Sequence, residues 1–308
     1  MRSTRIWDPK PSRPSDRQSL LSWVVVQNCI SSIPLAERAP DSLVNHAATY
    51  LDRILVRHRE LATKDERDVD QLVERCHTMA PTRGFRQRLM NDALSGISVI
   101  SEIKRRSPSK GDLVVGLDPE LIAVAYESGG ASCLSVLTDE EFFGGSISDL
   151  QRASSACELP VLRKDFTISR HDVCDARLMG ADCVLLIAAA LSQAELREFH
   201  SLATDVGLDV LVEIHDEREL EFAVQAKATL IGVNQRDLVT FQVDHARALR
   251  MANLIPTGVA RVAESGVRNT EDAAELHEAG YHAILVGESL VTAPDPSEAV
   301  RLLRHARR

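Results

Sequence analysis

The stretch that decides the fold runs from Ile97 to Gly111 and reads Ile-Ser-Val-Ile-Ser-Glu-Ile-Lys-Arg-Arg-Ser-Pro-Ser-Lys-Gly. Its first residues form a short, β-branched apolar run that is typical of a strand. Glu102 and Lys104 are two residues apart, so on a strand they project from the same face. Burying charge is costly unless the charge is paired. The stretch is therefore either a solvated strand end with a chance salt bridge or the start of a polar site, whose turn after Ser107 would suit an anion.

Similar apolar runs recur along the chain, and each is followed by a segment with helical periodicity. Because parallel strands are buried on both faces, this alternation predicts a parallel sheet covered by helices. Eight such units between residues 97 and 306 match an α/β fold of the (β/α)8 TIM barrel type, and a doubly wound open sheet is the alternative. The predicted strands are 97–103, 132–138, 160–164, 182–188, 208–214, 229–234, 260–264 and 282–287, and the predicted helices are 118–128, 146–156, 170–179, 192–205, 216–226, 243–252, 270–279 and 296–306.

The part of the chain before the first predicted strand is organised differently. Residues 1–45 are rich in Pro, Arg and Ser near their start and are predicted to be an N-terminal extension that is partly mobile. Residues 46–308 are predicted to be a single barrel domain, which includes extra helices at 46–60, around 69–73 and up to residue 94. The apolar stretch 20–26 faintly resembles a signal sequence, but it lacks a clear small-residue cleavage site.

Composition limits the possible partners and location. The formal net charge is −9, which argues against a protein that binds nucleic acid through bulk electrostatics. No stretch approaches the ~18 continuous apolar residues of a membrane span, so no membrane partner is expected. The six cysteines are scattered without a C-x-x-C pair, which disfavours zinc and disulfides and indicates a reduced, cytoplasmic setting.

Polar side chains stand at the C-terminal end of nearly every predicted strand. In a barrel these ends converge on one face, which is where active sites lie. A single polar strand end carries no information, but seven of the eight are hard to explain as a solvated edge. They supply Glu102, Lys104, Thr138, Asp139, Lys164, Asp165, Glu213, His215, Asn234, Arg236, Glu264, Ser265, Glu288 and Ser289.

Four of these residues suit acid–base chemistry or substrate orientation. Lys164 would lose solvation in a barrel mouth, which lowers the pKa of a lysine, although a lone lysine after a strand is more often a surface residue. Glu213 has apolar neighbours that could raise the pKa of its carboxyl, or it could be a structural partner for a lysine. Asn234 and Arg236 offer an amide and a guanidinium that could orient a carboxylate or hydroxyls. The sequence contains no Ser/His/Asp set and no metal-ligand spacing.

Two short segments predict a phosphate site. Ser265 and Gly266 follow the seventh predicted strand, and Gly287 and Glu288 follow the eighth. Small residues let a phosphate approach backbone N–H groups, and a nearby helix N-terminus favours negative charge. Loops after strands seven and eight form the usual phosphate site of these barrels. Ordinary glycine turns with a helix cap are the alternative interpretation.

The motifs at the strand ends together resemble one family, indole-3-glycerol phosphate synthase. They occur in the order ISEIKRRSPSKG, SVLTDEEFFGGS, PVLRKDF, LVEIHDERELE, IGVNQRDL, AESGV and LVGESLV. The resemblance spans residues 48–306 and implies a carboxy-lyase of tryptophan biosynthesis. Its substrate would be 1-(2-carboxyphenylamino)-1-deoxy-D-ribulose 5-phosphate, which would close its ring and lose CO2 and water to give indole-3-glycerol phosphate.

The resemblance also implies roles for individual catalytic residues. Lys164 matches the general acid that protonates the ketone oxygen as the ring closes. Glu213 matches the carboxylate that assists proton removal and dehydration. Lys104 matches the lysine that holds the substrate carboxylate, and Glu102 and Asn234 match residues that position these groups.

The remaining matched residues would bind substrate. Phe166 would pack on the anthranilate ring, Arg236 would orient the substrate, and Glu264 belongs with the substrate-binding residues. The phosphate would be held by Ser107, Ser265, Gly266, Gly287 and Glu288, the last through its backbone. The resemblance implies no cofactor and no metal, and a monomer or weak homodimer. A phosphoribosyl isomerase on the same kind of barrel and a non-catalytic paralogue are the alternatives.

Overall fold

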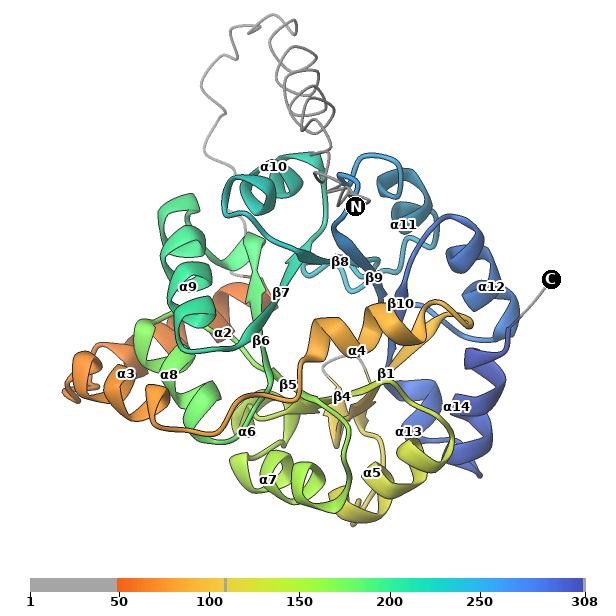
Figure 1. Ribbon diagram of the computed structural model, residues 1–308, viewed down its shortest axis with the longest axis horizontal. Helices are drawn as coiled ribbons and strands as arrows, with labels where there is room; N and C mark the ends of the chain where they lie inside the picture. The colour runs from red at the N-terminus through yellow and green to blue at the C-terminus, as the bar shows by residue number, and fades with distance from the viewer. Residues whose placement is uncertain (1–48, 108–109, 307–308) are drawn as a thin grey trace, which may run out of the picture. The chain divides into compact units, whose positions relative to one another are not determined.

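The computed structural model describes residues 49–107 and 110–306, in which eight parallel strands form a closed barrel (Figure 1). Around the barrel their order is β1-β10-β9-β8-β7-β6-β5-β4, which confirms the predicted (β/α)8 barrel and excludes the open sheet. Each strand lies within its predicted range. The strands are β1 (Ser98–Ile103), β4 (Cys133–Leu137), β5 (Val161–Lys164), β6 (Cys183–Ile187), β7 (Asp209–Ile214), β8 (Leu230–Asn234), β9 (Ala260–Glu264) and β10 (Ala283–Val286).

A predicted helix follows each barrel strand and lies outside the barrel. Most of these helices begin where a Ser, Asp or Asn side chain accepts a hydrogen bond from a backbone N–H of the first turn, as Ser146 does from Asp149 and Asn269 does from Asp272. The helices are α5 (Pro119–Ser128), α7 (Ile147–Ala156), α8 (Arg170–Leu178), α9 (Gln193–Asp205), α10 (Glu217–Gln225), α11 (Ala246–Met251), α12 (Thr270–Glu278) and α14 (Pro296–Arg304). Among the described residues, every helix is too short or too polar to cross a bilayer.

Several short elements were not predicted from the sequence. They are the two-stranded hairpin β2 (Arg106–Ser107) and β3 (Gly111–Asp112), the helices α6 (Glu140–Phe143) and α13 (Glu288–Val291), and the 3-10 turn η1 (Ala188–Ala190). Elements of two to four residues span about one helical turn at most, so they show no repeat and hydrophobic periodicity cannot reveal them. They all lie in connections between a barrel strand and the helix that follows it.

The barrel has an inner and an outer apolar layer, and this arrangement positions the site. Ile100, Leu162, Leu211 and Val262 belong to the inner cluster, whereas alternate residues such as Val99 pack against the surrounding helices. Side chains two positions apart on a strand share a face. The residues two positions after the inner ones are Glu102, Lys164, Glu213 and Glu264. The same alternation that fills the barrel therefore directs these charged side chains inward at its C-terminal end.

The N-terminal end of the barrel is closed by the helix α4 (Phe85–Asp92), which Figure 1 shows lying across the barrel opening. Phe85 and Leu89 of α4 are fully buried in the inner apolar cluster. The backbone N–H groups of Arg83 and Arg86 donate to the carboxylates of Asp182 and Asp209, at 2.7 and 2.9 Å. The opposite end of the barrel is thus the one available for a substrate.

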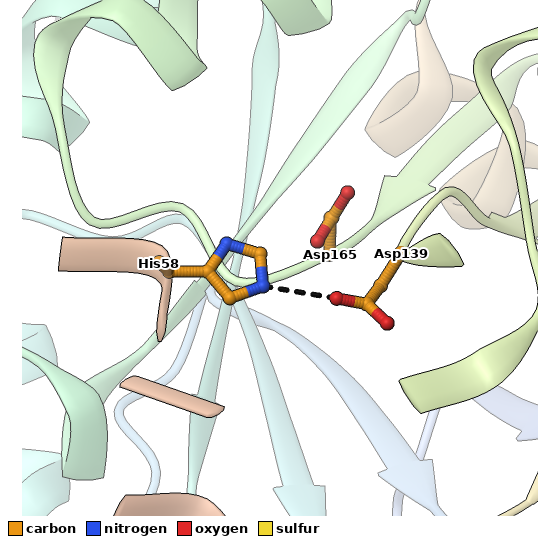
Figure 2. Close-up of side chains that lie close together, drawn as sticks. All are labelled: His58, Asp139 and Asp165. Atoms are coloured by element: carbon orange, nitrogen blue, oxygen red, sulfur yellow. Dashed lines mark hydrogen bonds and ion pairs between the residues drawn. The ribbon is translucent and has the colours of Figure 1, made fainter. Parts of the chain in front are cut away.

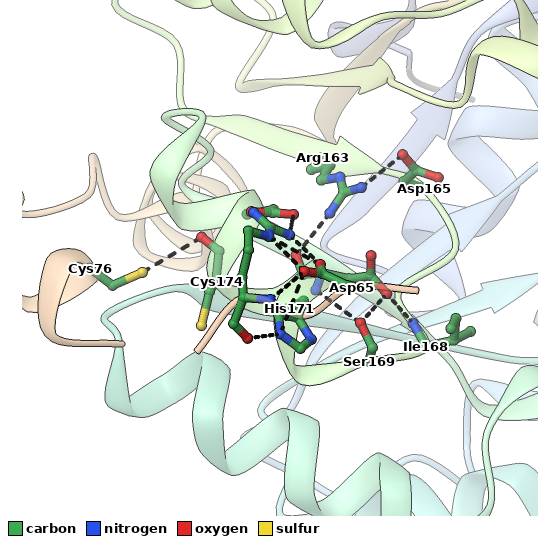
Figure 3. A network of polar contacts seen from close by, with 11 residues as sticks. Asp65, Cys76, Arg163, Asp165, Ile168, Ser169, His171 and Cys174 are labelled. Atoms are coloured by element: carbon green, nitrogen blue, oxygen red, sulfur yellow. Dashed lines mark hydrogen bonds and ion pairs between the residues drawn. The ribbon is translucent and has the colours of Figure 1, made fainter. Parts of the chain in front are cut away.

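Two further helices, α2 (Tyr50–Ala62) and α3 (Val69–His77), precede α4 and pack beside α8 and α9. Arg67 bridges Asp65 of the α2–α3 connection and Asp175 of α8, with its two hydrogen bonds to Asp175 both 2.8 Å long. Figure 3 shows Asp65 beside His171 of α8. The hydrogen bonds from Arg67 lower the pKa of Asp65 to about 2. These helices match the predicted extra helices. The predicted extension 1–45 and the apolar stretch 20–26 lie outside the described residues.

Candidate active site

A cavity of about 460 Å³ opens at the C-terminal ends of the strands and contains the whole set of predicted site residues. Its wall also includes residues that the sequence did not single out. The predicted residues in its wall are Glu102, Lys104, Ser107, Lys164, Phe166, Glu213, Asn234, Arg236, Glu264, Ser265, Gly266, Gly287 and Glu288, and the additional ones include Lys110, Leu137, Phe143, Leu185, Leu238, Phe241, His245 and Arg268. Most of the additional residues are apolar or lie in loops, where no periodic pattern marks them.

Glu102 and Lys104 form an ion pair inside this cavity. Lys104 Nζ lies 2.5 Å from Glu102 Oε1, and the two side chains are 17% and 6% exposed. The prediction that Glu102 and Lys104 project from the same face is therefore confirmed. The alternative, a solvent-exposed strand end with a chance salt bridge, is excluded. The carboxylate occupies space that depends on Gly287, because a Cβ built at that glycine would lie 2.3 Å from Glu102 Oε1.

Lys164, at the end of β5, reaches across the barrel to two glutamates. Its Nζ is 3.3 Å from Glu213 Oε2 and 3.8 Å from Glu264 Oε2. Burial by itself lowers the pKa of the ammonium, as expected from the sequence, but the charges of Glu213, Glu264 and Glu102 outweigh burial and raise the pKa. The expected fall in the pKa of Lys164 is therefore wrong, and the side chain is a protonated ammonium group that can act as an acid.

Glu213 of β7 has three polar partners in or beside the cavity. Asn234 Nδ2 donates to its Oε1 at 3.0 Å, and His215 Nε2 lies 3.6 Å from the same atom. Burial raises the pKa of Glu213, but Lys164, His215 and the Asn234 amide together leave it lowered. The expectation of a raised pKa for Glu213 is therefore wrong, because its apolar neighbours are outnumbered by cations and donors that only the folded chain brings together.

The loop after β8 places Arg236 at the rim. Its backbone N–H donates to Asn234 Oδ1 at 3.0 Å, and its Nη1 donates to the carbonyl of Phe241 at 3.1 Å. These bonds fix the orientation of the Asn234 amide, whose other end donates to Glu213. Arg236 thus supports the loop as well as lining the cavity.

Four of the five predicted phosphate residues directly follow β9 and β10, and the fifth, Ser107, lines the same cavity from β2. Ser265 and Gly266 both adopt left-handed backbone conformations, with φ of 64° and 79°. A Cβ at Gly266 would lie 2.6 Å from a methyl carbon of Val243, so only glycine fits this close approach. The side chain of Glu288 forms an ion pair with Lys110 at the edge of the cavity.

Aromatic side chains form the opposite wall. The Phe166 ring lies 6.2 Å from the ring of Phe143, which follows β4, and 5.5 Å from the imidazole of His58 on α2. The predicted aromatic contact surface therefore includes Phe143, which belongs to the sequence string SVLTDEEFFGGS but was not chosen as a site residue.

Behind this wall, His58, Asp139 and Asp165 come close enough together to hold a metal ion (Figure 2). His58 Nε2 lies 3.0 Å from Asp139 Oδ2, and the other oxygen of Asp139 accepts from the backbone of Phe142 and Phe143. Asp165 accepts from Arg163, as Figure 3 also shows, and from the Thr138 hydroxyl. The oxygens of these two carboxylates already accept hydrogen bonds from protein groups. The three residues are therefore better suited to holding α2 against the barrel than to binding a cation.

Comparison with known proteins gives concordant results. The family model for indole-3-glycerol phosphate synthase matches residues 51–303. The indole-3-glycerol phosphate synthase of Chlorobium luteolum is 45% identical over 249 residues, which cover 80% of this chain and 95% of that protein.

Two solved structures resemble the fold. One is a thiamine phosphate pyrophosphorylase from Pyrococcus furiosus, with a TM-score of 0.51 and 17% identity, over 70% of this chain and 96% of that one. The other is an N-acetylmannosamine-6-phosphate 2-epimerase from Clostridium perfringens, with a TM-score of 0.51 and 12% identity, over 65% and 90%. At these identities the likeness shows the barrel fold alone.

The closed barrel and its mouth of lysines and glutamates define a (β/α)8-barrel enzyme. The family match and the close relative specify which one: the chain belongs to the indole-3-glycerol phosphate synthase family. It is therefore a carboxy-lyase of tryptophan biosynthesis, as the seven sequence motifs implied.

Proposed function

We propose that this cavity converts 1-(2-carboxyphenylamino)-1-deoxy-D-ribulose 5-phosphate to indole-3-glycerol phosphate with loss of CO2 and water. The observation that carries the proposal is the pair of lysine–glutamate contacts, Lys104 with Glu102 and Lys164 with Glu213, that face one cavity. Ring closure needs an acid at the ketone oxygen, and the later dehydration needs an acid and a base. Two ammonium groups, each beside a carboxylate, provide both functions.

Lys164 is the general acid of ring closure in this proposal. Its raised pKa keeps it protonated, and the neighbouring carboxylates hold the ammonium inside the cavity. Transfer of a proton to the developing alkoxide neutralises charge as it forms, which stabilises the transition state more than the ground state. Glu213, whose lowered pKa keeps it ionised, then assists removal of a proton during dehydration.

Lys104 holds the substrate carboxylate that leaves as CO2, and Glu102 positions Lys104. Asn234 orients Glu213 through its amide. The aromatic wall around Phe166 packs on the anthranilate ring, and Arg236 and Glu264 complete the substrate contacts. The phosphate lies against Ser107, the Ser265–Gly266 backbone and the Gly287–Glu288 backbone, where small residues allow close approach.

The protein as a whole acts as a monomer or weak homodimer in the cytoplasm in this proposal. The five cysteines in the described part of the chain are buried and unpaired, which suits a reducing compartment. Sedimentation of the full chain across a concentration series measures its mass, and a tight higher oligomer would contradict this part of the proposal.

A direct assay tests the activity. Purified full-length protein is mixed with the proposed substrate, and the rise of indole absorbance and fluorescence is followed. We expect turnover without added cofactor or metal. Absence of indole formation, under conditions in which another member of the family turns over, would contradict the proposal. Turnover of phosphoribosylanthranilate instead would identify an isomerase.

A further inference from the structure

The deepest part of the cavity holds more buried carboxyl groups than cations. Glu102, Glu213 and Glu264 are 5%, 1% and 1% exposed, and the lysines beside them are Lys104 and Lys164. A buried charge without a partner is strongly disfavoured. The substrate of the proposed reaction brings a carboxylate and a phosphate, so an additional uncompensated negative charge would also repel it.

Two of the three carboxylates have close donors. Glu102 has the Lys104 ammonium at 2.5 Å. Glu213 has Lys164 at 3.3 Å and the Asn234 amide at 3.0 Å, with His215 beyond them at 3.6 Å. Both are therefore suited to the ionised form.

Glu264, at the end of β9, is bonded differently. Its Oε1 is buried and accepts no hydrogen bond from a protein donor, and its Oε2 is 3.8 Å from Lys164 Nζ, which is beyond hydrogen-bond distance. The neighbouring carboxyl of Glu213 can share a hydrogen bond with Glu264 only if one of the two carries a proton. Oε1 lies over Gly232 of β8: a Cβ built there would be 1.9 Å from Oε1 and 3.2 Å from the Leu211 Cδ1 methyl carbon. One carboxyl oxygen thus sits in an apolar slot that exists because residue 232 has no side chain.

Other charged groups nearby do not compensate the third buried carboxyl group. Asp165 also lines the cavity, but it is bonded to Arg163 and Thr138, and His215 is bonded through Nδ1 to Glu219 at 3.0 Å. The groups that act on Glu264 are Glu213 and Glu102, which repel its negative form, and Lys164, which is already closer to Glu213.

We propose that Glu264 is a neutral carboxylic acid in the resting enzyme and donates its proton in a hydrogen bond to Glu213, which makes it a positioning residue of the proposed reaction. In this state two ionised carboxylates face two ammonium groups, so the site is balanced before an anionic substrate enters. The proton stays on Glu264 through the reaction. Its hydrogen bond gives Glu213 a second neutral donor besides the Asn234 amide.

The electrostatics of the site agree with this assignment. Burial raises the pKa of Glu264 well above its ordinary value of 4.5, and Glu213 and Glu102 raise it further, while Lys164 lowers it only in part. A carboxyl whose pKa is raised in the folded state contributes its stability below the unfolded pKa, and that contribution is lost as the pH rises through the folded pKa. Ionisation of Glu264, as the pH rises through its folded pKa, therefore opposes both the fold and the binding of an anion.

Infrared spectroscopy of the free enzyme tests the proton directly and needs no substrate. At neutral pH the wild type should show the C=O stretch of a protonated carboxyl, and this band should be absent from Glu264→Gln. Asp209→Asn is the matched control, because burial also raises the pKa of Asp209, at the other end of the barrel. The band assigned to Glu264 should remain in this variant. Absence of the band from the wild type, or its survival in Glu264→Gln, would overturn the proposal. Because the substrate is not involved, this result is independent of whether the proposed activity holds.

Kinetics test the positioning role. Glutamine keeps a neutral donor, so Glu264→Gln should keep kcat within about tenfold of the wild type, whereas Glu264→Ala should lose more than a hundredfold. The wild-type KM should rise as the pH increases through the folded pKa of Glu264, and Glu264→Gln should lose that rise. Equal loss of kcat in the two variants, or an unchanged rise of KM in Glu264→Gln, would contradict the proposal.

The slot offers a third test. Gly232→Ala places a methyl group where Oε1 lies and should remove or shift the protonated-carboxyl band. Gly287→Ala places a methyl group against Glu102 instead and should leave the band in place. Circular dichroism checks that both variants fold. A band unaffected in folded Gly232→Ala would show that Glu264 does not occupy this slot.

Discussion

The two ends of the barrel differ in how the buried carboxylates are hydrogen-bonded. At the N-terminal end, Asp182 accepts from the backbone of Arg83 at 2.7 Å and of Val161 at 2.8 Å, so each carboxylate oxygen has a donor. At the C-terminal end, Lys164 and Glu213 meet at 3.3 Å, and Glu264 Oε1 has no partner. The closed end uses charge to tie loops and α4 to the barrel. The open end directs its lysines and glutamates into a cavity, where a substrate can reach them.

The largest expected effect comes from removing a charge at the open end. Lys164→Ala should lower kcat by about 10³-fold, roughly 4 kcal/mol in the barrier, with a much smaller change in KM, because it removes the acid of the reaction. It also leaves Glu213 and Glu264 without their nearest ammonium group, so some loss of stability is expected, but the fall in kcat of the folded protein should be the larger effect. Steady-state indole formation and thermal unfolding measure the two quantities.

Lys64→Ala, at an exposed position, is the matched control and should behave as the wild type. If Lys164→Ala left kcat unchanged, or mainly lowered the stability, the claim that the open end serves catalysis and the closed end serves stability would be contradicted.

A substitution at the closed end should lower the stability of the protein and leave kcat unchanged. Asp182→Ala leaves the buried N–H groups of Arg83 and Val161 without an acceptor, which should cost about 3 kcal/mol in the free energy of unfolding. The kcat of the folded fraction should stay unchanged. Denaturant unfolding combined with kinetics at low temperature tests this prediction, and Asp205→Ala, at an exposed site, serves as the control. A selective fall in kcat would mean that the closed end also serves catalysis.

A smaller, pH-dependent effect is expected at His58, which links α2 to the rim of the open end. Burial lowers the pKa of its imidazole, but the hydrogen bond to Asp139 and the charges of Asp165, Asp139 and Asp172 outweigh burial and raise it. The stability it contributes is therefore fully present below the unfolded pKa near 6.5 and is lost as the pH rises through the folded pKa.

His58→Gln should accordingly lower the free energy of unfolding by about 2 kcal/mol in mildly acidic solution and by less in alkaline solution. Urea unfolding across a pH series measures the difference. His77→Gln, which alters an exposed pair with Asp205, should change little at any pH. A loss for His58→Gln that does not vary with pH would show that packing, and not charge, holds α2 in place.

Much of the fold follows from local patterns. The alternation of short β-branched runs with helical segments predicted each barrel strand and each large helix, because the barrel has a buried inner and outer face that every strand must fill. The elements that the pattern missed, such as α6 and α13, are too short to show a period. Each of the predicted site residues lies in the cavity because each follows an inner-face residue or begins a loop at the same end.

The sequence by itself determined the barrel, the family and the residues at the strand ends, since these depend on periodicity and on the order of motifs. Only the tertiary structure decided the charge states. Lys164 and Glu213 both shift in the direction opposite to that expected from burial, because burial is visible in the local sequence but the partners that oppose it come from distant strands. The apolar slot at Gly232 has the same origin, since a pairing between β8 and β9 places a glycine beneath the carboxyl of Glu264. Electrostatic energy depends on distances between residues far apart in the chain, and folding alone sets those distances.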